Sequence, residues 1–282
     1  MWEKPFSDLS SLAGRQEGLI TAAQANRSNI PIEALIHFKQ AALIAEIDWN
    51  VYQLAGSQLG ARYAYPLAAW LGLRPEQFQW ERLDGVPDAV LSHEAACSLH
   101  RMGTIAAPLE VFTTPEERDA PPGTRIHVGK LAADDFVIHA SVPVTTPRRT
   151  IVDLVRDWTE HADVANVLAD AVRQDLVDLR AVHSDLAPLA TEHEFPAEGR
   201  DFIAYFMPGL SPAALSERNK RAHAILTEPE RVAELRQSVQ RLLADAGAPA
   251  DEALSLDLAA EIAARTTRRQ AGGGSTNTVA IS

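Results

Sequence analysis

The sequence has little cysteine, no long apolar run and a deficit of positive charge. Its single cysteine, Cys97, cannot form an internal disulfide or a cysteine-rich metal site, which fits a reducing compartment. No stretch approaches the roughly 18–20 consecutive apolar residues that a membrane span needs. The N-terminus also lacks the basic segment followed by an apolar stretch that marks a secretory signal. We therefore expect a soluble, cytoplasmic protein.

Positive charge is the second shortage. The chain has 26 Lys and Arg residues against 38 Asp and Glu residues, a net charge of −12. This argues against charge-driven nucleic-acid binding over the whole surface, because neutralising phosphates requires clustered Lys and Arg. A local DNA-reading patch remains compatible with this charge.

The apolar content of 46% predicts a folded chain. At 282 residues the chain is long enough for one large domain or two ordinary ones.

Residues 1–60 predict three helices followed by a hairpin. Apolar residues at helical spacing predict a first helix, and a second short helix starts at Thr21. Pro31 suits the first turn of a third helix, because proline loses no hydrogen bond there. Two short apolar runs around residues 48–50 predict the hairpin. This order is the pattern of a winged helix-turn-helix. The expected inner faces are Phe6, Leu9, Leu12 and Ala13 for the first helix and Ile32, Leu35, Ile36 and Leu43 for the third.

The character of the sequence changes after a helical connector. A helix is expected to begin at Ser92, and helical spacing dominates after residue 161. Between them, four short runs have the pattern of strands: 109–113, 125–128, 136–139 and 142–145. We expect an α+β fold. Its expected parts are a winged helix-turn-helix (1–60), the connector (61–84), a mixed small-sheet and helical domain (85–270) and a flexible tail (271–282).

Several short motifs follow one another in a fixed order over roughly residues 1–160. They are the spacing Phe6…Leu12-Ala13, the run 18–25 beginning Gly18-Leu19-Ile20-Thr21, the wing end Val51-Tyr52-Gln53-Leu54-Ala55-Gly56, the run Val90-Leu91-Ser92-His93-Glu94-Ala95-Ala96, and the run 142–154 beginning Val142-Pro143-Val144-Thr145. In this order they resemble the AbiEi-type antitoxins of bacterial type IV toxin–antitoxin systems. Residues 161–282 carry no further resemblance.

The resemblance implies a two-part protein. No enzymatic activity and no cofactor are expected, and an enzyme with an unrecognised site is the third alternative. In that family the winged domain binds inverted repeats in the promoter of its own operon and represses it. The following domain counteracts a partner toxin, which is a nucleotidyltransferase-like protein. Inverted repeats would also suit a homodimer on the DNA.

The DNA-reading residues expected here lie around the third helix and the hairpin. Base readout needs Arg, Asn or Gln side chains, and phosphate contact needs Lys, Arg or backbone amides. The candidates are Arg15, Gln16, Thr21, Gln24, Arg27, Ser28, Asn29, His37, Lys39, Trp49 and Asn50. Residues 1–60 nevertheless hold four basic against six acidic side chains, a net charge of −2. An alternative is therefore an interaction or scaffold protein whose winged domain no longer binds DNA and serves protein contacts or dimerisation.

Two further features of the sequence bear on partner and metal binding. Arg148 and Arg149 lie at the start of a predicted helix, where positive charge opposes the helix dipole, so we expect them to contact a partner. His93 and His100 are seven residues apart, whereas zinc helices favour a spacing of four, so no metal site is expected. The sequence also lacks a nucleophile elbow, a phosphate-cradling glycine loop and a dinucleotide fingerprint.

Overall fold

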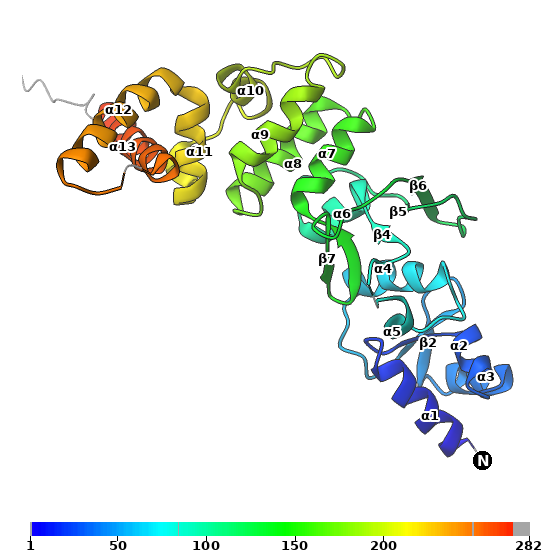
Figure 1. Ribbon diagram of the computed structural model, residues 1–282. Helices are drawn as coiled ribbons and strands as arrows, with labels where there is room; N and C mark the ends of the chain where they lie inside the picture. The colour runs from blue at the N-terminus through cyan, green and yellow to red at the C-terminus, as the bar shows by residue number, and fades with distance from the viewer. Residues whose placement is uncertain (1, 84, 250, 273–282) are drawn as a thin grey trace, which may run out of the picture. The chain divides into compact units, whose positions relative to one another are not determined.

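The computed structural model describes residues 2–83, 85–249 and 251–272 (Figure 1). The fold combines helices with one three-stranded and one five-stranded sheet, which confirms the predicted α+β class. The chain forms two compact units. The first unit comprises the residues up to Arg101 together with Ile105–Thr150, and the second comprises Met102–Thr104 and the residues from Ile151 onward. No helix of the described ranges is both long and apolar enough to cross a membrane.

The first unit opens with three helices and three short strands. The strands pair antiparallel in the order β1-β3-β2, and residues 47–50 connect β2 to β3 as a tight hairpin. The predicted helices and hairpin are present, and β1 is an additional strand. The elements are α1 (Glu3–Gly14), β1 (Leu19–Thr21), α2 (Ala22–Arg27), α3 (Ile32–Gln40), β2 (Ile44–Glu46) and β3 (Val51–Leu54).

The core of these elements corrects the predicted face of α3. Leu9, Ala13 and Leu35 are buried as expected. Ile32 and Ile36 are instead 49% and 51% exposed, and Leu43 is 37% exposed. The buried face of α3 is Ala34, Leu35 and Phe38. Phe38 lies about 200° around the helix from Ile36, and burying its larger ring removes more apolar surface from water.

The rest of the first unit surrounds a mixed five-stranded sheet of order β6-β5-β4-β8-β7. Its core contains fully buried Trp70, whose indole nitrogen donates to the carbonyl of Ala89 at 2.8 Å. All four predicted strands are present, and the two-residue strand β4 between β5 and β8 was not predicted. The elements are α4 (Ala61–Gly72), α5 (Gln79–Arg82), β4 (Val90–Leu91), α6 (His93–His100), β5 (Glu110–Thr114), β6 (Thr124–Val128), β7 (Phe136–His139) and β8 (Val142–Thr145).

The second unit is helical throughout its described residues, as the sequence pattern after residue 161 predicts. Helix α7 (Pro147–Arg156) leads into it from the first unit. The C-terminal helices pack on small residues such as Ala224, Ala260 and Ala263. The helix α13 continues to Gly272, and the remaining expected tail, 273–282, lies outside the described residues. The other helices are α8 (His161–Arg173), α9 (Leu179–Leu186), α10 (Gly199–Phe206), α11 (Glu217–Thr227), α12 (Pro229–Asp245) and α13 (Glu252–Gly272).

Candidate nucleic-acid interface

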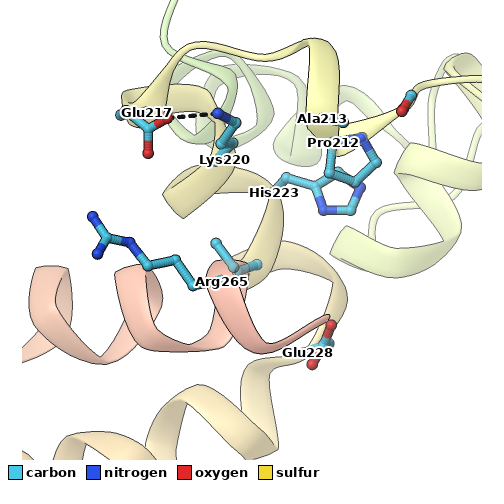
Figure 2. A pocket seen from close by; sticks show the side chains of 10 residues that line it. Pro212, Ala213, Glu217, Lys220, His223, Glu228 and Arg265 are labelled. Carbon is cyan, nitrogen blue, oxygen red and sulfur yellow. Dashed lines mark hydrogen bonds and ion pairs between the residues drawn. The ribbon is translucent and has the colours of Figure 1, made fainter. Parts of the chain in front are cut away.

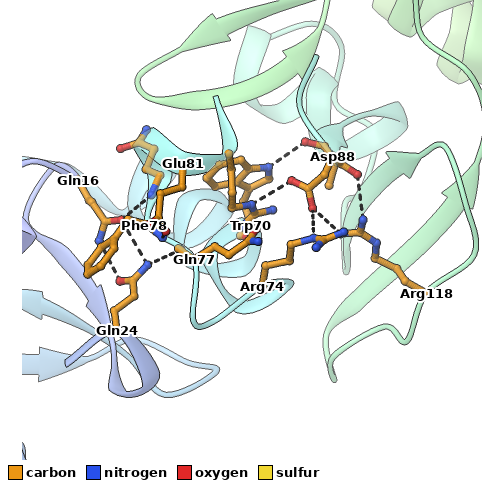
Figure 3. A network of polar contacts seen from close by, with 12 residues as sticks. Gln16, Gln24, Trp70, Arg74, Gln77, Phe78, Glu81, Asp88 and Arg118 are labelled. Carbon is orange, nitrogen blue, oxygen red and sulfur yellow. Dashed lines mark hydrogen bonds and ion pairs between the residues drawn. The ribbon is translucent and has the colours of Figure 1, made fainter. Parts of the chain in front are cut away.

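A buried glutamine cluster holds α2 against the loop before α5 (Figure 3). Gln16, Thr21 and Gln24 are fully buried. The Gln24 side chain accepts from the Thr21 amide at 3.0 Å and donates to the carbonyl of Gln77 at 2.7 Å. The Gln16 side chain donates to Gln24 at 2.9 Å and accepts from the amide of Gln79 at 2.8 Å. Buried amides need such partners, so these bonds fix the position of α2.

The cluster overturns three of the predicted DNA contacts. Gln16, Thr21 and Gln24 were expected to face DNA, yet none of these side chains reaches the surface. Thr21 and Gln24 form a capping box at the start of α2, and the Thr21 hydroxyl also donates to the carbonyl of Pro75. The Thr-x-x-Gln spacing that signals a capping box was readable in the sequence. The contacts with Pro75 and Gln77 could not be predicted from the sequence, because these residues lie more than fifty positions away in the chain.

Arg27, at the end of α2, is held by α5 and the loop before it. Both terminal nitrogens of its guanidinium donate to the Glu81 carboxylate at 2.7 Å. A third bond reaches the carbonyl of Glu76 at 3.0 Å, and the guanidinium lies 5.3 Å from the Phe78 ring centre. The hydrogen bond from Arg27 lowers the pKa of Glu81 below its usual value, so the pair is ionised at neutral pH. Arg27, a predicted DNA contact, thus has an acidic partner, while its side chain remains 49% exposed.

Arg15 also faces α5. Its guanidinium lies 3.7 Å from the centre of the Trp80 ring, a cation–π contact. Its side chain is exposed, so this contact leaves it within reach of solvent.

The exposed face of α3 has little net positive charge. The Lys39 ammonium donates to Glu46 on β2 at 2.5 Å, and that hydrogen bond raises the pKa of Lys39. His37 stacks on Trp2, with ring centres 5.2 Å apart. The uncharged side chains Ile32 and Ile36 occupy the outer surface of the helix. Such a face suits apolar contact and amide hydrogen bonds better than phosphate contact.

Trp49 connects the tip of the hairpin to Pro122 and Tyr65 elsewhere in the first unit. Trp49 and Asn50 both have left-handed backbone, with φ of 52° and 55°, as a tight hairpin turn of this kind requires. The Trp49 indole nitrogen donates to the carbonyl of Pro122 at 2.6 Å, and its ring lies 4.8 Å from the ring of Tyr65. Trp49 therefore anchors the hairpin, and its side chain remains partly exposed, so its predicted role as a DNA contact stays a prediction. Asn50 is exposed.

Polar side chains remain exposed at the start of α3. Ser28 is half-buried at the end of α2, and Asn29 is exposed with a left-handed φ of 61°. Asn26, which the sequence analysis did not select, is exposed beside them. Asn26 and Asn29, on either side of the turn before α3, and Asn50 at the hairpin tip thus present exposed side-chain amides.

The two predicted partner-binding arginines differ in their surroundings. The Arg149 guanidinium forms a 2.7 Å ion pair with Asp135, and both side chains are largely shielded from solvent. The pair holds the start of α7 against the loop before β7. Arg148 is exposed at the surface of the same helix turn. Its role in partner binding stays a prediction.

An ionic cluster inside the first unit was not anticipated (Figure 3). Arg82 is buried over Trp70, with the guanidinium 3.5 Å from the ring, and burial lowers its pKa to about 10. Arg82, Arg74 and Arg118 all donate to Asp88 at 2.6–3.0 Å. Burial opposes ionisation of Asp88, but these guanidiniums outweigh it and hold the Asp88 pKa below its usual value. The cluster thus connects the segment after α4, the last residue of α5 and the segment after β5 to the segment before β4.

A cavity of about 480 Å³ lies between α11 and α13 in the second unit (Figure 2). Its cations already have acidic partners: Lys220 pairs with Glu217 at 2.5 Å, and Arg265 pairs with Glu261 at 2.7 Å. The imidazole of His223 lines its wall, and burial lowers the His223 pKa. The cavity has mixed charge and favours no single ligand class.

The two histidines of α6, His93 and His100, each form a hydrogen bond within the first unit. The Nε2 atom of His100 bonds the carbonyl of Thr145 at 2.7 Å, and the Nδ1 atom of His93 bonds the Ser92 hydroxyl at 2.9 Å.

Comparison with known proteins adds no assignment: no protein-family model and no curated protein matches this sequence.

Proposed function

We propose that this protein is a non-catalytic regulator of the antitoxin type, whose N-terminal elements form a winged helix-turn-helix. The observation that carries the proposal is the element order of residues 3–54: helix, strand, helix, helix and a two-stranded hairpin, with strand order β1-β3-β2. Under this proposal α3 is the recognition helix and the β2–β3 hairpin is the wing. The proposed ligands are promoter DNA with inverted repeats and a nucleotidyltransferase-like toxin, both in the cytoplasm.

The DNA half of the proposal requires an unusual mode of recognition. The cations Arg27 and Lys39 are paired with Glu81 and Glu46, and Arg15 lies against Trp80. Binding would depend on the exposed amides of Asn29 and Asn50 and on apolar contact of Ile32 and Ile36 with thymine methyl groups. Few phosphates would be neutralised, so affinity would depend only weakly on salt.

The antitoxin half is tested by growth rescue. The product of the neighbouring gene is expressed in a heterologous host, alone and together with this protein. We expect growth arrest by the neighbour alone and normal growth on co-expression. A neighbour that is harmless, or one whose toxicity is unchanged by this protein at equal expression, contradicts the antitoxin role whatever the result with DNA.

A second function, protein binding through α3, is favoured by one specific observation. The outer face of α3 exposes Ile32 and Ile36 to about half of their surface, with Leu43 following the helix. Exposed neighbouring apolar side chains are typical of protein contacts or dimer interfaces. Light scattering on the wild type and on an Ile32→Ser/Ile36→Ser variant tests this: a dimer that the variant abolishes supports it, and a monomer in both contradicts dimerisation through α3.

A further inference from the structure

A second hollow in the helical unit has a different character from the cavity between α11 and α13. It has a volume of about 320 Å³ and lies where α7 ends and α8 begins, beside the loop that precedes α10. Its chemistry-bearing lining consists of Trp158, Glu160, His161, His193 and Glu194, and it is called the Trp158 hollow below. None of these residues was selected by the sequence analysis for ligand binding.

Trp158 lies at the C-terminal cap of α7, where the amide of Thr159 donates to the carbonyl of Leu154 at 3.1 Å. It follows α7 with a left-handed backbone, φ 56°, where glycine would be free of steric strain. Its side chain is 62% exposed, so the indole contributes little to the core. Its ring lies 4.3 Å from that of His193, at an interplanar angle of 44°. The exposed indole therefore offers an aromatic face for stacking beside the hollow.

His193 provides an independent sign of a ligand. Its side chain is only 4% exposed, yet its Nδ1 atom has no hydrogen-bond partner among the described residues. A buried polar atom without a partner costs about 1–3 kcal/mol, so such atoms are uncommon in folded proteins. The neighbouring His161 is different, because its Nδ1 atom bonds the Tyr205 hydroxyl at 2.7 Å and is held in place.

The charge around the hollow is negative. The two flanking segments, 157–163 and 190–198, contain six carboxylates and no Lys or Arg. Glu160 and Glu194 belong to the lining, and neither forms an ion pair with any residue that the structure describes. The hollow thus combines an exposed indole, imidazoles and two carboxylates without a countercharge.

We propose that the Trp158 hollow binds an arginine side chain presented by a partner protein. A guanidinium is planar, so it stacks on an indole face and donates two parallel hydrogen bonds to a carboxylate. The ammonium of lysine stacks less well and cannot form this paired contact. A divalent metal fits less well, since these residues are not among the described side chains whose ligand atoms converge within 4.8 Å. The proposal rests on the proposed antitoxin role only for the identity of the partner.

The test follows indole resonances of the full-length protein labelled with nitrogen-15. The chain has five tryptophans, and the Trp158→Leu variant identifies the Trp158 signal by its loss. Titration with tetra-arginine should shift the Trp158 signal while leaving those of the other four in place. The shift should saturate, and tetra-lysine should bind several-fold more weakly. No selective shift of Trp158, or equal binding of the two peptides, overturns the proposal.

Two matched double variants test whether the carboxylates of the hollow bind the arginine side chain. Glu160→Gln/Glu194→Gln should weaken tetra-arginine binding about tenfold, because both carboxylate acceptors lose their charge. Glu230→Gln/Glu234→Gln makes the same charge change on exposed positions of α12 and should leave binding unchanged. Equal weakening by both pairs would mean that net charge alone drives binding and would overturn the proposal. A Trp158 shift produced by zinc but not by tetra-arginine would also overturn it. Because the probe is a peptide, arginine binding can be lost while growth rescue is retained, and the reverse.

Discussion

The Gln24→Ala substitution separates a structural role of the glutamine cluster from a role in DNA contact. Gln24 is fully buried and connects Thr21, Gln16 and Gln77 through its side-chain amide. The alanine removes half of the capping box, which contributes about 1 kcal/mol. It also leaves the Gln16 side chain and the Gln77 carbonyl short of a partner, at about 1–3 kcal/mol for each buried group. We expect the free energy of unfolding of the first unit to fall by at least about 3 kcal/mol, the sum of the lower ends of these contributions.

Urea unfolding followed by tryptophan fluorescence measures this change. Four of the five tryptophans, Trp2, Trp49, Trp70 and Trp80, lie in the first unit, so the signal reports mainly on its unfolding. Gln40→Ala is the matched control, because Gln40 ends α3 and is exposed. It should change the free energy of unfolding by less than about 0.5 kcal/mol. A Gln24→Ala protein as stable as this control, but unable to bind DNA, would refute the structural role.

Three other predictions follow from named groups in the first unit. Burial raises the pKa of Glu110 from 4.5 to about 7. The folded state therefore favours protonated Glu110. This contribution to the free energy of unfolding is complete below pH 4.5 and is lost as the pH rises through 7. Glu110→Gln should remove up to about 3 kcal/mol of this pH dependence, measured by urea unfolding between pH 4.5 and 8. Burial also raises the pKa of the Cys97 thiol to about 12, so Cys97 should react with an aromatic disulfide reagent only after unfolding, and rapid labelling of the native protein would contradict this. Glu81→Gln should release the Arg27 guanidinium and steepen the salt dependence of DNA binding by about one charge, and an unchanged slope would show that Arg27 does not reach phosphate.

Local patterns predicted the elements of the first unit well. The helical spacing of Leu9 and Ala13, the proline before α3 and the turn residues at 48–50 are signals within a few residues of the structures they predict. The proposal of a winged helix-turn-helix rests on these signals together with the order of the elements. Local spacing did not predict which face of α3 is buried. Ile32 and Ile36 fit the spacing of an inner face, but the buried volume of Phe38 decides which side packs.

The candidate site was harder to predict, because its residues are defined by distant partners. Gln24, Arg27 and Trp49 have the side chains that DNA contacts require, and each is instead bound by a segment 49 to 73 residues further along the chain. Residue type alone does not distinguish a glutamine that reads a base from one that satisfies a buried carbonyl. Glu160 and His193 gave no signal either, since they form a hollow only after the loop before α10 returns to the end of α7.

The central claim is that residues 3–54 are a winged helix-turn-helix that reads DNA, and equilibrium binding to the upstream region of the operon tests it most directly. Fluorescence anisotropy is measured with duplexes carrying the inverted repeat or a scrambled version, from 50 to 300 mM salt. We predict preference for the inverted repeat, a logarithmic salt slope no steeper than about −2 because Arg27 and Lys39 are paired, and loss of the preference in Asn29→Ala. Equal affinity for the two duplexes at every salt concentration would contradict the claim and leave protein binding through α3 as the function of this domain.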